Sequence, residues 1–128
     1  MDFIIKGVSI PLAYTIRAKK ALREEFDSPE ALQRAFAVDN DVDLAFNASR
    51  IAAILAEAEW YRQKAEAGLL GTDITARRIP QDDLFSMLDT DTTLELVRAI
   101  TQTVTEANKT SVQAESTESK KEEAGLSK

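Results

Sequence analysis

The alternation of apolar and polar positions is clearest between Asp41 and Ala67. This stretch has no proline or glycine and is rich in alanine, leucine, glutamate, arginine and glutamine, so it predicts one long helix. Asp41 is the expected N-cap, and Gly68 is the expected end, where a left-handed conformation is cheap. The apolar side chains fall on two nearly opposite sides, Val42, Ala45, Phe46, Ala53, Ala56 and Trp60 on one and Leu44, Ala48, Ile51, Leu55 and Ala58 on the other. A helix that is apolar on two sides packs on two sides, so we expect the fold to be built around it.

A β-hairpin is predicted over residues 2–12. Two short β-rich runs, 3–5 and 8–10, flank Lys6-Gly7, where glycine supplies the positive φ of a tight turn. Pro11 ends the second run because it has no N–H to donate. Since two strands alone are marginally stable in water, the hairpin must lie on the helices.

Four further helices are predicted from their start signals. The first runs from Leu12 to Phe26, and the second begins at Ser28-Pro29 with Ser28 as N-cap. Pro80 begins the next, and one of residues 89–92 caps a last helix that ends near Ala107. The expected inward side chains are Leu12, Ile16, Leu22 and Phe26; Leu32, Ala35 and Phe36; Leu84, Phe85 and Leu88; and Leu94, Val97, Ile100 and Val104.

The character of the chain changes at Asn108. From there to the end only Val112 and Leu126 are larger aliphatic residues, and the remainder is mostly Ser, Thr, Glu and Lys. Such a segment cannot bury enough apolar surface to offset its ordering entropy. We therefore predict a mainly α protein: a helical domain of about five helices with an N-terminal hairpin over residues 1–107, and a disordered tail over residues 108–128.

Composition restricts the chemistry of the protein. The chain has 128 residues with Cys 0 and His 0, so thiol chemistry and the commonest general base and metal ligand are missing. The formal net charge is −6 and the predicted tail is neutral, so the acidic charge lies on the predicted domain, which disfavours binding to nucleic acid or an anionic membrane. No apolar run is long enough to span a membrane and no signal peptide is evident, so we expect a cytoplasmic protein.

Acidic pairs are the remaining candidates for catalysis or metal binding. Asp39, Asp41 and Asp43 match the first ligands of a calcium-binding loop, but Leu44 and Arg50 stand where that loop needs Gly and Glu. Helix capping explains these acids and those at 82–83 and 89–91 more simply. We expect no enzyme activity, no metal site and no cofactor.

A protein partner is the more natural ligand. Trp60 is interpreted as closing the edge of the core, with an interface anchor as the alternative, and Tyr61 is the better surface candidate. Basic side chains occur in the first helix, after Tyr61, and in the irregular segment before Pro80. The candidate partner-binding residues are Tyr61, Arg62, Arg77, Arg78, Arg17 and Lys20.

The layout resembles the tail assembly chaperones of long-tailed bacteriophages and prophages, particularly those of Gram-positive hosts. The resemblance covers roughly residues 1–107 and rests on MDFIIKGVSIPL followed by YTIRAKKALREEF, on EWYRQKAEAG, on IPQDDLFSMLD and on TTLELVRAITQTV. It is a likeness of order and character, with no invariant motif from which contact residues could be transferred.

The resemblance implies a non-enzymatic protein of the host cytoplasm that binds the tape-measure protein or tail-tube subunits and is absent from the finished virion. It also implies that a longer, frameshifted form can exist, which Lys120-Lys121 would suit. The alternative is another acidic helical adaptor, or an antitoxin-like partner of a basic protein. A DNA-binding regulator is disfavoured by the negative charge, and the sequence leaves open whether the chain forms homo-oligomers.

Overall fold

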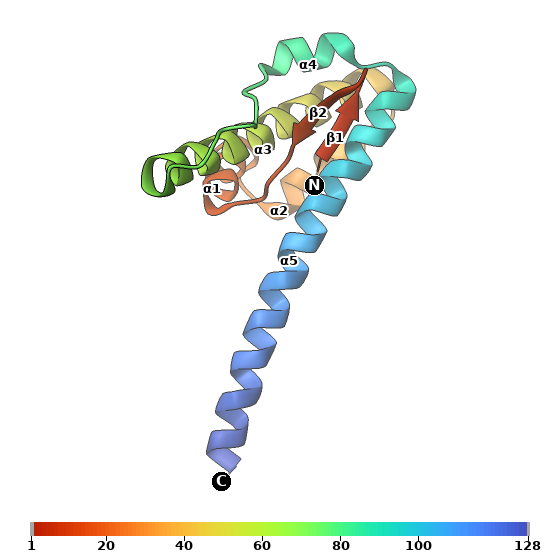
Figure 1. Ribbon diagram of the computed structural model, residues 1–128. Coiled ribbons are helices and arrows are strands. Elements are labelled where there is room, and N and C mark those ends of the chain that lie inside the picture. The colour runs from red at the N-terminus through yellow and green to blue at the C-terminus, as the bar shows by residue number, and fades with distance from the viewer. Residues whose placement is uncertain (1, 128) are drawn as a thin grey trace.

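The architecture is a helical domain with an N-terminal hairpin, as predicted (Figure 1). A computed structural model describes residues 2–127, with Pro29 and residues 109–127 described by their backbone alone. The elements in chain order are β1 (Asp2–Ile5), β2 (Val8–Pro11), α1 (Ile16–Phe26), α2 (Pro29–Phe36), α3 (Asp41–Leu70), α4 (Gln81–Met87) and α5 (Thr90–Ser127). Beyond Asn108, the side chains of the predicted tail lie outside what the structure describes.

The hairpin forms because its turn accepts positive φ at two successive residues. Lys6 has φ 49° and Gly7 has φ 77°, and β1 pairs antiparallel with β2 so that Phe3 faces Ile10. Phe3, Ile5 and Ile10 are buried, whereas Ile4 points outward and is 63% exposed. The strands pack on α5 and α3, as expected, because a two-stranded hairpin by itself is only marginally stable in water.

Helix α3 is the centre of the fold, as predicted. It contacts α1, α2, α4, α5 and β2, and Ala48, Ile51, Ala52 and Leu55 are fully buried along it. Residues of both predicted sides are buried, which confirms that the helix packs on two of its sides. Val42 and Phe46 were expected on one of these packed sides, but they are 63% and 47% exposed at the N-terminal end of α3.

Both ends of α3 differ from the prediction. The N-cap is Asn40 rather than Asp41, and its side-chain oxygen accepts the N–H of Asp43 at 2.8 Å. The helix continues through Gly68 and ends at Gly71, whose φ is 73° and whose N–H donates to the carbonyl of Ala67 at 2.9 Å. Two glycines three residues apart could each have ended the helix, and only the later one takes the left-handed conformation.

Helix α1 begins four residues later than predicted. Thr15 is its N-cap and accepts the N–H of Ala18 at 3.2 Å. The preceding residues cross α3, where the N–H of Ala13 donates to the carbonyl of Leu55 at 3.3 Å. Leu12 is therefore buried before the helix starts, whereas Ile16, expected to face inward, is 78% exposed.

Helices α2 and α4 agree with their predicted start signals. The hydroxyl of Ser28 accepts the N–H of Ala31 at 3.1 Å at the start of α2, and Pro80 immediately precedes α4. Leu84 is buried, and the ring of Phe85 meets Phe46 edge-on with 5.9 Å between ring centroids. These contacts hold α4 across the N-terminal part of α3.

The buried side of α5 also differs from the predicted one. Ile100 is buried as expected, but Leu94 is 45% exposed, and the residues buried beside Ile100 are Thr93, Leu96, Ala99 and Thr103. The hydroxyls of Thr93 and Thr103 donate to the carbonyls of Asp89 and Ala99 at 2.6 and 2.7 Å. Because each hydroxyl donates to the carbonyl four residues earlier, threonine can face the core, which a count of aliphatic residues misses.

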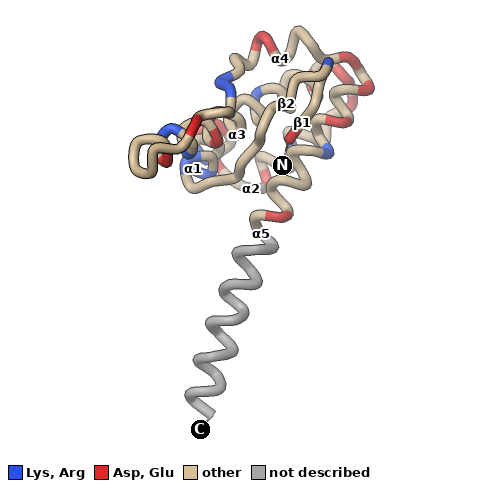
Figure 2. Tube along the Cα trace, viewed as in Figure 1, with Lys and Arg blue, Asp and Glu red and all other residues tan. Residues whose placement is uncertain are grey.

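Charge is unevenly distributed over the domain. Acidic residues occur where α3 begins, in α4 and at the start of α5 (Figure 2). The starts of α3 and α5 are neighbours, since the hydroxyl of Thr90 donates to the carboxylate of Asp41 at 3.0 Å. The acidic residues of these three places are Asp39, Asp41, Asp43, Asp82, Asp83, Asp89 and Asp91.

Candidate partner-binding groove

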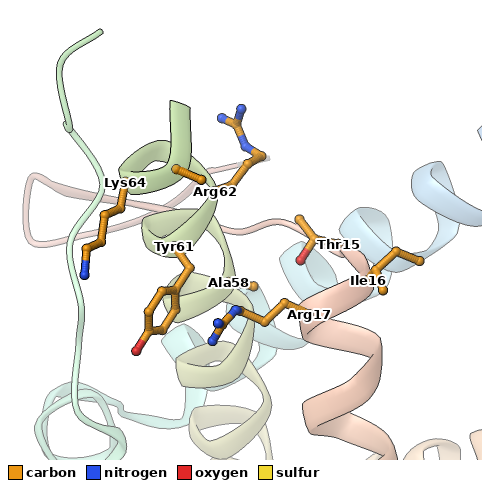
Figure 3. A pocket seen from close by; sticks show the side chains of 8 residues that line it. Thr15, Ile16, Arg17, Ala58, Tyr61, Arg62 and Lys64 are labelled. Carbon is orange, nitrogen blue, oxygen red and sulfur yellow. The ribbon is translucent and has the colours of Figure 1, made fainter. Parts of the chain in front are cut away.

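An open groove of about 560 Å³ lies between the start of α1 and the C-terminal half of α3 (Figure 3). We call it the α1–α3 groove. The residues that line it are Thr15, Ile16, Arg17, Ala58, Tyr61, Arg62, Lys64 and Ala65.

The groove exists because α1 starts late and α3 presents small residues. Ala58 and Ala65 are seven residues apart and share one side of α3, where their methyl groups leave room above the helix. Ile16, the first residue of α1, is 78% exposed beside them. Leu69 follows Ala65 by one turn on the same side and is 84% exposed, so apolar surface continues beyond the groove.

Aromatic rings and guanidinium groups stack at one wall of the groove. The guanidinium carbon of Arg17 lies 3.8 Å from the centroid of the Tyr61 ring, and that of Arg78 lies 5.6 Å from the same ring. Arg78 is also 5.0 Å from the ring centroid of Trp60. All three distances are within the range of cation–π attraction, so the cations and rings hold one another in place.

The segment between α3 and α4 is tied back onto α3 and thereby brings Arg78 to these rings. The side-chain oxygen of Gln63 accepts the N–H groups of Thr75 and Ala76 at 2.7 and 2.9 Å. Arg78 then forms an ion pair with Glu57 at 3.3 Å. A loop without helix or strand is thus positioned by one amide side chain and one ion pair.

Two of the cations are neutralised within the protein. Arg62 forms ion pairs with Glu59 and Glu66, and hydrogen bonding to the Glu59 carboxylate is the main cause that raises the pKa of Arg62. Arg78 is paired with Glu57 as described. In contrast, Arg17 and Lys64 have no carboxylate partner among the described residues. Within that part of the chain, the groove therefore presents two uncompensated positive charges.

The structure brings together four of the six candidate residues. Arg17, Tyr61 and Arg62 line the groove, and Arg78 stacks on Tyr61; in Figure 3 Arg17 reaches from α1 toward the ring while Arg62 points away from it. Lys20 and Arg77 are exposed but do not line the groove.

Sequence reasoning missed Ile16, Thr15 and Lys64 as groove residues. Ile16 was assigned to the buried side, although the N-cap signal of Thr15 directly before it could have corrected that assignment. Trp60 is half-buried and lies outside the buried core cluster, against Tyr61 at 5.0 Å between ring centroids. Its ring contacts Tyr61, Lys64 and Arg78, and of these Tyr61 and Lys64 line the groove.

Metal ligands and unpaired buried polar atoms do not gather in the described part of the chain. Among its residues there is no group of three acidic side chains placed to hold a metal ion, and no buried side-chain polar atom without a hydrogen-bond partner. None of the helices, in the part of the chain that is described, is both long and apolar enough to cross a membrane. The groove is larger than the hollow between α1, α2 and α5, of about 360 Å³, and the hollow at the acidic end, of about 350 Å³.

Comparison with protein-family models, with curated proteins and with solved structures found no match to this chain.

Proposed function

We propose that the protein is a non-enzymatic tail assembly chaperone of a long-tailed phage or prophage, and that it binds a helical segment of its partner in the α1–α3 groove. The observation that carries the proposal is the open groove itself, with an exposed isoleucine on one side and a stacked tyrosine on the other. Grooves of this kind accept the apolar side of an amphipathic helix.

The order of elements supports the same assignment. A hairpin runs into a basic helix, a long alanine-rich helix follows, and a short helix after Pro80 leads into the last one. This is the order on which the resemblance to tail assembly chaperones rests. The proposed partners are the tape-measure protein and tail-tube subunits, met in the host cytoplasm, with the chaperone absent from the finished virion.

The test is co-expression with the neighbouring genes, followed by pull-down and identification of the captured proteins by mass spectrometry. We expect a very long, helix-rich protein or a tail-tube subunit. Ile16→Gln should reduce capture about tenfold, because a buried isoleucine contributes roughly 1.5–3 kcal/mol to an interface. Ile4→Gln is the matched control, since Ile4 is also exposed but lies on β1, outside the groove.

Three results would count against the proposal. Capture of only a small basic protein would favour the adaptor function, and capture of nothing would remove the chaperone assignment. Equal loss of capture in Ile16→Gln and Ile4→Gln would remove the groove as the binding site. Thermal midpoints of both variants should match that of the unmodified protein, which separates loss of contact from loss of fold.

The acidic end of the domain favours one alternative. Val42, Phe46 and Phe85 form a partly exposed apolar surface there, next to Asp41 and Asp89. An acidic rim around apolar side chains suits a basic partner, as expected of an adaptor or an antitoxin-like protein. Phe46→Gln would abolish capture of such a partner, whereas Ile16→Gln would leave it unchanged.

A further inference from the structure

We propose that the α1–α3 groove selects a partner helix whose apolar stripe is bordered by carboxylates, and that Arg17 is the residue that recognises a carboxylate. This inference rests on the proposed function only in that the groove binds a helix. It adds the chemistry of the bound segment, which neither the sequence nor the resemblance assigns.

The length of the apolar surface specifies a helical occupant. Ala58 is buried at the floor of the groove, and the exposed Ala65 and Leu69 continue the same side of α3, so the three residues span about 16 Å at 1.5 Å rise per residue. Ile16, at the start of α1, adds an exposed apolar side chain at the groove. Three turns of a second helix have the same length. An occupant with apolar residues at positions i, i+3 or i+4, and i+7 would cover the exposed side chains.

The charged side chains around this surface favour an occupant that carries negative charge. The carboxylates beside the groove, those of Glu57, Glu59 and Glu66, are already paired with Arg78 and Arg62. Arg17 and Lys64 have no such pairing among the described residues, although the chain as a whole has a net charge of −6. Lys20 lies one turn after Arg17 on the same side of α1 and adds to the positive rim.

The contact with Tyr61 holds the guanidinium group of Arg17 in place to bind a carboxylate. Stacking at 3.8 Å fixes the plane of the guanidinium group while its edge N–H groups remain able to donate. A carboxylate can accept two parallel hydrogen bonds from that edge. Because the side chain is already held, less rotamer entropy is lost when the partner binds.

The experiment compares two synthetic helical peptides without tryptophan. Both carry leucine at i, i+3, i+4 and i+7; one has glutamate beside the leucines and the other has lysine at the same places. Binding to the full chain is followed by the fluorescence of Trp60, the single tryptophan, which lies against Tyr61 at the groove wall. Calorimetry provides a second measurement of each affinity.

We expect the glutamate peptide to bind at least tenfold more tightly than the lysine peptide. Arg17→Met should weaken the glutamate peptide about tenfold, as expected for a lost charge-assisted hydrogen bond, and leave the lysine peptide no weaker. Arg17→Lys should give an intermediate loss, because it keeps the charge without the planar donor pair. Arg98→Met is the control, since Arg98 is exposed on α5 away from the groove.

Equal affinities, or preference for the lysine peptide, would overturn the inference. So would an Arg17→Met variant that is folded by circular dichroism and binds the glutamate peptide normally. These results are separable from failure of the proposed function. Capture of a tail protein without charge preference would refute only the carboxylate recognition, whereas glutamate preference with no tail protein captured would refute only the chaperone assignment.

Discussion

At the scale of single residues, side-chain caps define where the helices begin. Thr15, Ser28 and Asn40 each accept the N–H of the residue three positions later. Asp89 does the same for Thr92 at 2.8 Å, and the Thr92 hydroxyl accepts the N–H of Asp89 in return at 2.8 Å. This reciprocal pair satisfies two N–H groups at the start of α5. The N–H of Thr92 is the main cause that lowers the pKa of the Asp89 carboxyl.

Asp89→Ala should lower the thermal midpoint at neutral pH more than Asp91→Ala, which removes the same charge from a neighbouring residue. A lowered pKa in the folded state means that the carboxylate stabilises the fold above its unfolded pKa of about 3.9, and that this stabilisation is lost as pH falls through the folded pKa. The difference between Asp89→Ala and the unmodified protein should therefore shrink below about pH 4. Thermal unfolding followed by circular dichroism over a pH series measures it, and a difference independent of pH would contradict the assignment.

At the scale of elements, the two glycines near the end of α3 have opposite roles. Gly68 lies inside the helix, where an added methyl group would meet no atom within 4 Å, whereas Gly71 ends the helix with φ 73°. Glycine inside a helix is unfavourable because it loses more backbone freedom than alanine on folding. Glycine at a left-handed position is favourable because other residues are strained there.

Gly68→Ala should stabilise the protein by about 0.5–1 kcal/mol, and Gly71→Ala should destabilise it by about 1–2 kcal/mol. The two variants make the same chemical change three residues apart, so each is the control for the other. Urea unfolding at constant temperature measures both free energies. If α3 ended at Gly68, as its sequence indicates, the signs would be reversed.

At the scale of the whole molecule, α3 connects the other elements into one core. Leu55 has no exposed surface and lies on the side of α3 crossed by the segment before α1. The buried cluster also includes residues of the hairpin, α1, α2, α4 and α5. A cavity in α3 would therefore weaken the packing of each of these elements. The acidic end and the groove lie toward opposite ends of this same helix.

Leu55→Ala should cost about 2–5 kcal/mol of the free energy of unfolding, because it removes buried methyl groups and leaves a cavity. Leu94→Ala is the matched control and should lower the free energy of unfolding much less than Leu55→Ala, since Leu94 is 45% exposed on α5. Chemical denaturation of both variants tests the pair. Similar losses would mean that Leu94 faces the core, as its place in the apolar stripe of the sequence predicts.

Local sequence was sufficient to predict which elements form. Positive φ at Gly7, the capping signal at Ser28, and an uninterrupted run of helix-forming residues in α3 each act over a few residues, so they can be recognised without knowledge of distant contacts. Arg17, Tyr61 and Arg62 were also recognised as candidate surface residues, because charge and aromatic character are visible without a fold. Their role in binding stays a prediction.

The ends of the helices, the buried side of α5 and the existence of a groove depended instead on tertiary packing. Gly68 and Gly71 are equivalent by local propensity, and the choice between them depends on how the following segment packs on α3. Thr93 and Thr103 can be buried because their hydroxyls donate to the carbonyls four residues earlier. The groove requires the start of α1 and the C-terminal half of α3, far apart in the chain, to lie side by side, and no periodicity within either helix specifies that arrangement.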